Sequence, residues 1–498
     1  MARSTLMVGS SMRWMTAVAL MALAMAGSGC ASTKPYRTSG EPCVINGPEK
    51  DGPNPDWESL NGTRPCADRW QVSVTKPVPF SVNFVEIDEQ GILASRDQAE
   101  AAIATASIAE PDGSYVVVFV HGWHHNASTN DSNVRAFYGA LASVSRWNPN
   151  RKVKGIYIGW RGDSLKITGL RYATFWDRKN TSDEVGRGGL LEFLLRLEHG
   201  VKADPASHNR LVVVGHSFGA SVTFNALSHL FLERFIDGVY STADKPRFRG
   251  YGDLVVLINP AIEAMRYMPF QSALEYYSRP TTRPQADFSH ETRPYLAMLS
   301  SQTDEATRLA FPAARFFSTV FEAHQGINAD NSPAAAPDYS EWNMDRDTMG
   351  NFKGFKTHFP LRLEKSPSSD RQQANGTLAA GLVESCHSLK ANELRRLLTI
   401  PGDDDSDTGG GVFPDSGMRV KKITRPGLDP LNGSPYIVAD VHSEIVDGHT
   451  HIGSPNLLCW INQLLDTNET EERPLRSSAD LPKGDLMLTD NVPSVARP

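Results

Sequence analysis

The sequence predicts an α/β protein with a mostly parallel central sheet flanked by helices. Short apolar segments rich in β-branched residues alternate along the chain with longer segments whose apolar residues recur at helical spacing. Most of the strand-like segments are apolar at nearly every position, as strands covered on both faces are. The alternation is interrupted over residues 311–430, so we expect a long insertion before the last core strand.

Composition excludes several classes of protein. The chain has 498 residues, of which 40% are hydrophobic, and 50 Lys+Arg against 57 Asp+Glu give a net charge of −7. Disordered chains are poorer in apolar residues, and nucleic-acid-binding proteins usually carry a basic patch. We expect six segments: an export signal (1–30), a Pro/Gly-rich lead-in (31–75), the core (76–310), an insertion forming a cap (311–430), the end of the core (431–470) and a tail (471–498).

The N-terminus has the order of charges and apolar residues that is typical of an export signal. Arg3 and Arg13 precede an apolar run at residues 14–26, which is shorter than the ~20 residues that a membrane-spanning helix needs. Three small residues then lead to Cys30, an arrangement that resembles a bacterial lipoprotein signal. We therefore expect an exported protein that is anchored to the envelope membrane through a lipid on Cys30.

Ordinary cleavage remains the alternative for this segment, because Gly27 stands where lipoprotein signals usually have leucine. Cleavage after Ala24 or Ala26 would leave a periplasmic or secreted protein with a free thiol at Cys30.

The other cysteines number four, an even count that permits two disulfides in an exported protein. Sequence alone allows three pairings of four cysteines. Proximity favours Cys43–Cys66 and then Cys386–Cys459, while buried free thiols are the alternative.

The first half of the core alternates regularly. Residues 80–87 alternate apolar and polar side chains as a half-buried strand does, and 115–120 form a continuous apolar strand. Helical spacing at 133–144 is followed by a strand at 153–160 and an apolar helix at 190–197.

The second half continues in the same way up to the insertion. We expect a buried strand at 211–214, a helix at 220–235, and short strands at 254–258 and 295–299. After the insertion, residues 436–441 form the last strand and 456–465 the last helix, which Pro455 starts well.

The most informative segment surrounds Ser217. A buried strand runs directly into Gly215-His-Ser217-Phe-Gly219 and then into a helix. A sharp strand-to-helix turn forces the serine into a strained conformation, in which side chains two residues away on either side would collide. Such a turn exposes the hydroxyl of Ser217 above the sheet edge, as a nucleophile requires.

This motif and its context resemble the α/β-hydrolase superfamily, over residues 75–305 and 435–466. The resemblance implies a serine esterase or lipase with a catalytic triad. It also implies that backbone N–H groups of Trp123, in the turn after His121-Gly122, and of Phe218 form an oxyanion hole. We expect no cofactor and no metal.

The resemblance places the acid of the triad after a late strand and the base after the last one. Asp304 lies at the right distance past residues 295–299, and Glu263 is the alternative acid. His449 follows a glycine in the last loop and is the expected base, with His451 and His442 as alternatives.

Other motifs have simpler interpretations. His124 and His125 lack a partner carboxylate at helical spacing, so we expect surface or substrate-contacting histidines rather than a metal site. Arg161 is expected to pair with a structural carboxylate, with an anionic substrate as the alternative. Tyr172, Phe175 and Trp176 are expected to pack in the core, with an acyl pocket as the alternative.

The sequence therefore predicts a serine hydrolase that cleaves a small-molecule or lipid carboxylic ester through Ser217, His449 and Asp304. Three alternatives stay open: an acyltransferase with the same triad, a peptidase or amidase, and a non-catalytic envelope protein on the same fold. We expect no nucleic-acid partner.

Overall fold

The structure is a computed structural model. It describes residues 34–37, 39–45, 79–162, 175–204, 207–242, 248–279, 281–288, 291, 293–319, 322, 340–364, 383, 385–402, 404–406, 408–424 and 434–465. The predicted export signal with Cys30, the cysteine Cys66, the aromatic residue Tyr172 and the predicted tail lie outside these residues. In the described part of the chain, no helix is both long enough and apolar enough to cross a bilayer.

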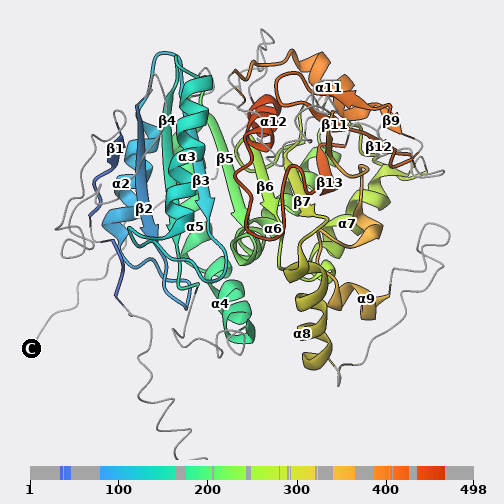
Figure 1. Cartoon of the computed structure of the whole chain (residues 1–498), viewed down its shortest axis with the longest axis horizontal. Coiled ribbons are helices and arrows are strands. Elements are labelled where there is room, and N and C mark those ends of the chain that lie inside the picture. Colours follow the sequence, from blue (N-terminus) through green and yellow to red (C-terminus); the bar gives the residue numbers. More distant parts are fainter. Residues whose placement is uncertain are drawn as a thin grey trace, which may run out of the picture.

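An eight-stranded sheet forms the centre of the molecule, with the strand order β1-β2-β4-β3-β5-β6-β7-β13 (Figure 1). Every neighbouring pair in it is parallel except β1 and β2. The strands are β1 (Cys43–Ile45), β2 (Phe80–Glu86), β3 (Ser114–Val120), β4 (Lys152–Gly159), β5 (Arg210–His216), β6 (Leu254–Ile258), β7 (Leu296–Ser301) and β13 (Tyr436–Val441). Their apolar composition suits strands that are covered on both faces.

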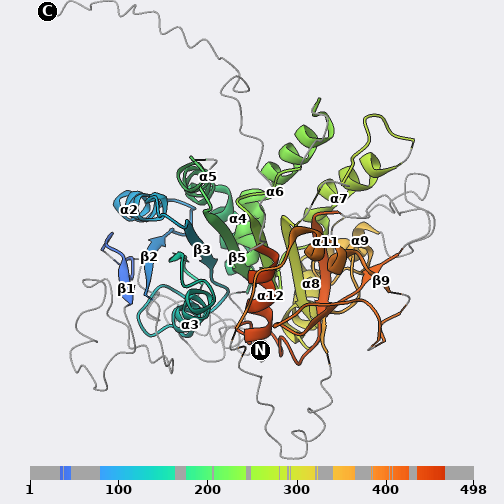
Figure 2. The ribbon, with the colours of Figure 1, turned by 90° about the horizontal axis from the view of Figure 1, so that it is seen from above.

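Helices cover both faces of this sheet (Figure 2). On one face lie α2 (Arg96–Ser107), α5 (Gly189–Val201), α6 (Phe218–Val239) and α7 (Ala264–Ser278), and on the other α3 (Ser132–Trp147) and α12 (Pro455–Leu465). The helix α4 (Phe175–Arg187) packs on α6. Each face has its own apolar core, one containing Phe193 and Phe231 and the other Phe137 and Trp460. The fold is therefore a three-layer α/β arrangement.

The predicted core strands and helices are all present, with ends that differ by a few residues. Besides the helix α4, three elements in the sheet or packed on it were not predicted from the sequence. The strand β1 is short, the alanine-rich helix α2 buries only small or polar side chains, and α7 contains Pro269, which normally interrupts a helix.

The predicted insertion adds elements beside β13 (Figure 1). Residues 357–361 run along that strand, where the N–H groups of Thr357 and Leu361 donate to the carbonyl oxygens of Val438 and Asp440. The described elements are α8 (Phe311–Ser318), α9 (Glu341–Arg346), η3 (Lys353–Phe355), β8 (Arg362–Leu363), α11 (Ala391–Thr399), β9 (Pro401–Gly402), β10 (Gly411–Val412), β11 (Met418–Val420) and β12 (Lys422–Ile423). That this segment forms a cap stays a prediction.

A disulfide between Cys386 and Cys459 ties the insertion to α12, which confirms one of the favoured pairings. Cys43 is also disulfide-bonded. Cys66, the partner that proximity favours for it, lies outside the described residues.

Candidate active site

Ser217 occupies the sharp turn between β5 and α6. Its backbone has φ 56° and ψ −123°, a conformation that non-glycine residues rarely adopt. The turn is fixed to the neighbouring strand, because the N–H of Ser217 donates to the carbonyl oxygen of Ile258 over 3.0 Å. The backbone strain at Ser217 is therefore imposed by the sheet.

The two glycines around Ser217 are required by close packing. A Cβ at Gly219 would collide with the carbonyl oxygen of Val120, and a Cβ at Gly215 would lie 2.7 Å from Oγ1 of Thr223. Because the first of these neighbours is backbone that belongs to a central strand, it cannot move aside. The spacing of glycine, serine and glycine thus has the steric cause that the sequence predicts.

Ser217, His449 and Asp304 form one chain of hydrogen bonds. The hydroxyl Oγ of Ser217 lies 2.7 Å from Nε2 of His449, and Nδ1 of His449 lies 2.9 Å from Oδ2 of Asp304. Since the carboxylate can only accept, Nδ1 carries the proton and Nε2 is left to accept the serine hydroxyl. The structure thus brings together the three residues that the sequence predicts for a triad.

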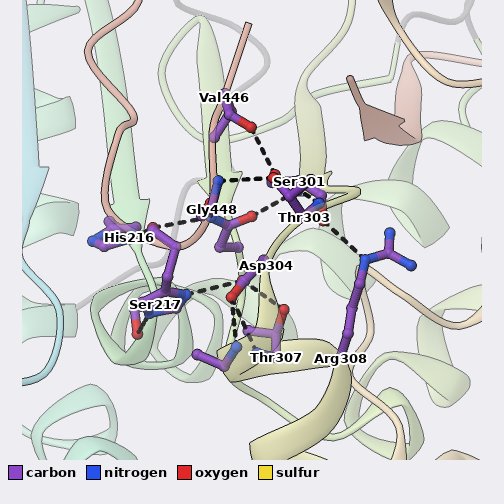
Figure 3. Close-up of polar contacts among 12 residues, drawn as sticks. His216, Ser217, Ser301, Thr303, Asp304, Thr307, Arg308, Val446 and Gly448 are labelled. Carbon is purple, nitrogen blue, oxygen red and sulfur yellow. Dashed lines mark hydrogen bonds and ion pairs between the residues drawn. The ribbon is translucent and has the colours of Figure 1, made fainter. Parts of the chain in front are cut away.

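Asp304 is fully buried and densely hydrogen-bonded (Figure 3). Besides His449, its carboxylate accepts the hydroxyl of Thr307 over 2.6 Å and the N–H of Ala306 over 2.9 Å. Burial by itself raises the pKa of Asp304, but the hydrogen bonds and the charge of His449 outweigh it, so the pKa is lowered. The group is therefore a carboxylate at neutral pH.

The loop that carries His449 is bonded to the loop that carries Asp304 (Figure 3). Gly448 turns the chain with φ 64°, and its N–H donates to Oγ1 of Thr303 over 2.9 Å. The hydroxyl of Ser301 donates to the carbonyl oxygen of Val446 over 2.7 Å. These bonds cross from the end of β7 to the loop after β13.

The turn predicted to form the oxyanion hole lies against the nucleophile. A Cβ at Gly122 would lie 2.8 Å from Cβ of Ser217, so the chain passes the serine at close range here. The ring of Trp123 lies 5.9 Å from that of Phe218, which is the first residue of α6. The N–H of Phe218 therefore lies at the positive end of that helix.

Glu263, the alternative acid, belongs to a separate group of charges. Its carboxylate lies 3.2 Å from Nζ of Lys179 and 3.3 Å from a guanidinium nitrogen of Arg315, with Arg266 at 3.9 Å. These ion pairs join α4, the start of α7 and α8. None of the bonds described for Glu263 involves a histidine.

The alternative histidines also have other partners. His442 lies 3.6 Å from the carboxylate of Glu444, and Nδ1 of the exposed His451 lies 3.1 Å from the carbonyl oxygen of Asp447. Neither histidine has a described bond to Ser217, whereas His449 does.

The histidines after β3 are held by the protein itself. His125 bonds to Asp131 over 3.0 Å and to Asn133 over 3.0 Å, while His124 stacks on the ring of Trp123. His121 is buried against Trp160, and burial lowers the pKa of His121 to about 4. No group of three or more metal-binding side chains occurs among the described residues.

Arg161 lies 3.3 Å from the carboxylate of Glu89, which Arg178 also binds over 2.7 Å. This is the structural pairing that the sequence favours. Phe175 and Trp176 begin α4, but the structure does not describe their side chains.

Two residues at the site were not predicted from the sequence. Asn259 has φ 47° at the end of β6, and its amide donates to the carbonyl oxygens of Gly448 and His449. Nε2 of His216 also lies 2.7 Å from the carbonyl oxygen of His449. The only sequence signals were an asparagine directly after a buried strand and a histidine beside the serine, and both occur commonly without function.

A cavity of about 410 Å³ lies between η2 (Ala306–Ala310), α8 and α9. Arg308, Arg346 and Lys353 line it together with Asp347. Burial raises the pKa of Asp347 to about 6. The residues that line this cavity do not include Ser217, Asp304 or His449.

No family model matches the chain, and no curated protein matches it. Among solved structures, it is similar to Trichoderma reesei cutinase in complex with a C11Y4 phosphonate inhibitor, with 15% identity, 42% of this chain and 73% of that one covered, and a TM-score of 0.18. It is also similar to a putative YdeN-like hydrolase from Pectobacterium atrosepticum, with 11% identity, 45% and 78% covered, and a TM-score of 0.15. Both neighbours are hydrolases, and at these TM-scores the similarity says nothing of the chemistry at Ser217.

Proposed function

We propose that the protein is a serine hydrolase of the α/β-hydrolase type that cleaves carboxylic esters. The observation that carries this proposal is the unbroken chain of hydrogen bonds from Ser217 through His449 to Asp304, with lengths of 2.7 and 2.9 Å. A serine hydroxyl is a weak nucleophile until a base removes its proton, and the base works best when a carboxylate fixes its tautomer.

The acylation step follows from these contacts. Oγ of Ser217 attacks the ester carbonyl carbon as its proton passes to Nε2 of His449, and the carbonyl oxygen becomes an oxyanion. Backbone N–H groups of Trp123 and Phe218 are the donors proposed for that oxyanion. The carbon–oxygen bond of the ester then breaks, and His449 returns the proton to the leaving alcohol.

Hydrolysis of the acyl-enzyme repeats the sequence with water as the nucleophile. His449 takes a proton from water, the hydroxide oxygen attacks the acyl carbon, and Oγ of Ser217 leaves with the proton that His449 returns. Asp304 stays ionised throughout and stabilises the imidazolium. The bonds from Thr307 and Ala306 keep that carboxylate oriented toward Nδ1.

A fluorophosphonate probe tests the assignment directly, because it reacts covalently with an activated serine. We expect wild-type protein to be labelled, and Ser217→Ala and His449→Ala to remain unlabelled while keeping a wild-type circular dichroism spectrum. Ser221, which is buried on α6 beside Asp183, supplies the control, since Ser221→Ala should label normally. Equal labelling of Ser217→Ala would end the proposal.

We also propose that the protein is exported and anchored through Cys30. The order of residues 1–30 supports export, and the disulfide between Cys386 and Cys459 suits an oxidising compartment. Cell fractionation tests the anchor: wild-type protein should sediment with membranes and Cys30→Ser should not. Equal partitioning of the two would exclude lipidation at Cys30.

A further inference from the structure

We propose that Asn259 and His216 are positioning residues, which hold the base His449 in place by binding its backbone carbonyl oxygen. This inference rests on the proposed function and extends it to two residues outside the triad. The carbonyl oxygen of His449 accepts Nδ2 of Asn259 over 3.0 Å and Nε2 of His216 over 2.7 Å. Both donors are buried, with Asn259 fully inaccessible and His216 2% exposed.

The side chain of Asn259 joins the loop that carries Asp304 to the loop that carries His449. Its Oδ1 accepts the N–H of Ser301 over 2.8 Å, next to the segment that carries Asp304. Its Nδ2 donates to Gly448 over 3.2 Å and to His449 over 3.0 Å. The amide of Asn259 is therefore a third link between these two loops, beside the bonds of Thr303 and Ser301.

Asparagine is the residue type that this position requires. The backbone of Asn259 has φ 47°, in the left-handed region that asparagine tolerates better than most side chains. Its N–H donates to the carbonyl oxygen of Leu299 over 2.7 Å, so β7 fixes the residue as well. An aspartate would keep the shape and the bond from Ser301, but it would place a carboxylate against two carbonyl oxygens.

His216 acts as a neutral donor rather than as a second base. Burial, followed by the nearby charge of His449, lowers the pKa of His216 to about 3, so the ring is neutral at working pH. Because its Nε2 faces a carbonyl oxygen, that nitrogen carries the proton. Its ring centre lies 5.0 Å from that of His449, and it supports the base from the strand that carries the nucleophile.

The consequence is that β5, β6 and β7 all contribute to the position of His449. Without these bonds, His449 is held by its own bonds to Asp304 and Ser217. Its loop keeps the bonds from Gly448 to Thr303 and from Ser301 to Val446. A shift of His449 by about 1 Å is enough to reduce a catalysed rate by ~100-fold, because the proton transfer needs close alignment. Loss of either donor should therefore lower the rate constant for chemistry and leave substrate binding unchanged.

The test uses the full chain, with p-nitrophenyl acetate as substrate and the fluorophosphonate probe. We expect Asn259→Asp, Asn259→Gly and His216→Leu to lower kcat and the labelling rate by about 10- to 100-fold, with KM within twofold of wild type. His216→Gln retains a donor near the same place and should recover most of the loss. Asn259→Gly tolerates φ 47°, so it separates the amide from the backbone conformation.

A proton spectrum gives a second measurement that does not depend on turnover. The Nδ1 proton of His449, bonded to Asp304, should give a low-field resonance that is absent in His449→Ala. We expect that resonance to shift or broaden in Asn259→Asp and to stay unchanged in Asn462→Asp. The latter is a matched control, since Asn462 is an equally buried asparagine on α12 that bonds to Asn148.

The outcomes separate this inference from the proposed function. If wild type is neither labelled nor active, the hydrolase assignment fails, and the low-field resonance alone decides the positioning role. If wild type is labelled but Asn259→Asp, Asn259→Gly and His216→Leu keep its rates and its resonance, the positioning role is wrong and the hydrolase assignment stands.

Discussion

Ser217 and Asn259, which lie at the site, are held in strained backbone conformations. Both are non-glycine residues with positive φ, a conformation that costs about 1–3 kcal/mol when the surroundings impose it. The turns at these two residues are hydrogen-bonded to each other. The N–H of Ser217 donates to the carbonyl oxygen of Ile258, just before Asn259, and the carbonyl oxygen of Ser217 accepts the N–H of Ala261, just after it. The sheet holds both strained residues at the carboxyl ends of adjacent strands.

The carboxylates Asp304 and Glu263 can be separated by substitution. Asp304→Asn should lower kcat/KM by about 10,000-fold, because the amide no longer favours the tautomer with a proton on Nδ1. Glu263→Gln should leave kcat/KM within a few-fold. It should lower the free energy of unfolding by about 2 kcal/mol, because Lys179 and Arg315 each lose one of two carboxylate partners and keep Asp183 and Asp345. Steady-state kinetics and urea unfolding measure both effects, and the reverse order in kcat/KM would make Glu263 the acid.

Among the elements, those with large apolar side chains in a clear period are the ones that sequence predicts. The helix α3 places Val134, Phe137, Leu141 and Val144 on its buried face, and this period is visible in the chain. The helix α2 buries alanines and Gln98 instead, so no such signal exists. The strand β1 is assigned only through its pairing with β2, which depends on tertiary contact.

The helix α3 offers a stabilising change. Gly139 lies inside it, and an added Cβ would meet nothing within 4 Å. Gly139→Ala should therefore raise the free energy of unfolding by about 0.5–1 kcal/mol, since alanine restricts the unfolded chain and favours helix. Urea unfolding measures the gain, and an unchanged esterase rate is expected alongside it. A loss of stability would mean that α3 is packed more closely there than the structure indicates.

The disulfide between the insertion and α12 should contribute strongly to stability. It closes a loop with a sequence separation of 73, for which the entropy of loop closure corresponds to about 4 kcal/mol. The double substitution Cys386→Ser/Cys459→Ser should lower the free energy of unfolding by up to that amount under oxidising conditions. Reduction of the wild type also breaks the disulfide of Cys43, so it should lower the free energy of unfolding at least as much. Identical unfolding midpoints for the two proteins would show that the insertion is held by other contacts.

At the scale of the whole molecule, buried histidines make stability depend on pH. Burial lowers the pKa of His121 and His358 to about 4 and that of His216 to about 3. Below pH 6.5 these histidines bind protons in the unfolded chain but not in the folded protein. The free energy of unfolding is therefore highest above pH 6.5 and decreases as the pH falls toward 4. Burial raises the pKa of Glu86 and that of Asp347, which offset part of this loss.

A substitution remote from the triad tests this pH dependence. His358 lies in the insertion, with Nε2 3.0 Å from the carbonyl oxygen of Leu398. His358→Gln keeps a donor but does not titrate, so the slope of unfolding free energy against pH should fall by up to about 1.4 kcal/mol per pH unit between pH 6.5 and 4. Urea unfolding at several pH values measures it. A slope equal to that of wild type would show that His358 is protonated in the folded protein.

The sequence by itself determined the order of the core strands along the chain, because the apolar period of each strand is a local property. It also determined the turn at Ser217, because that turn depends on the space that Gly215 and Gly219 leave. It also narrowed the acid and the base to a few residues each. Only the tertiary structure decided that Asp304 and His449, 145 residues apart, meet each other at Ser217. Their meeting depends on strands β7 and β13 lying side by side, and on Asn259 and His216 binding a backbone carbonyl oxygen. Contacts of that kind leave no pattern in one sequence, because any residue in the loop presents the same carbonyl group.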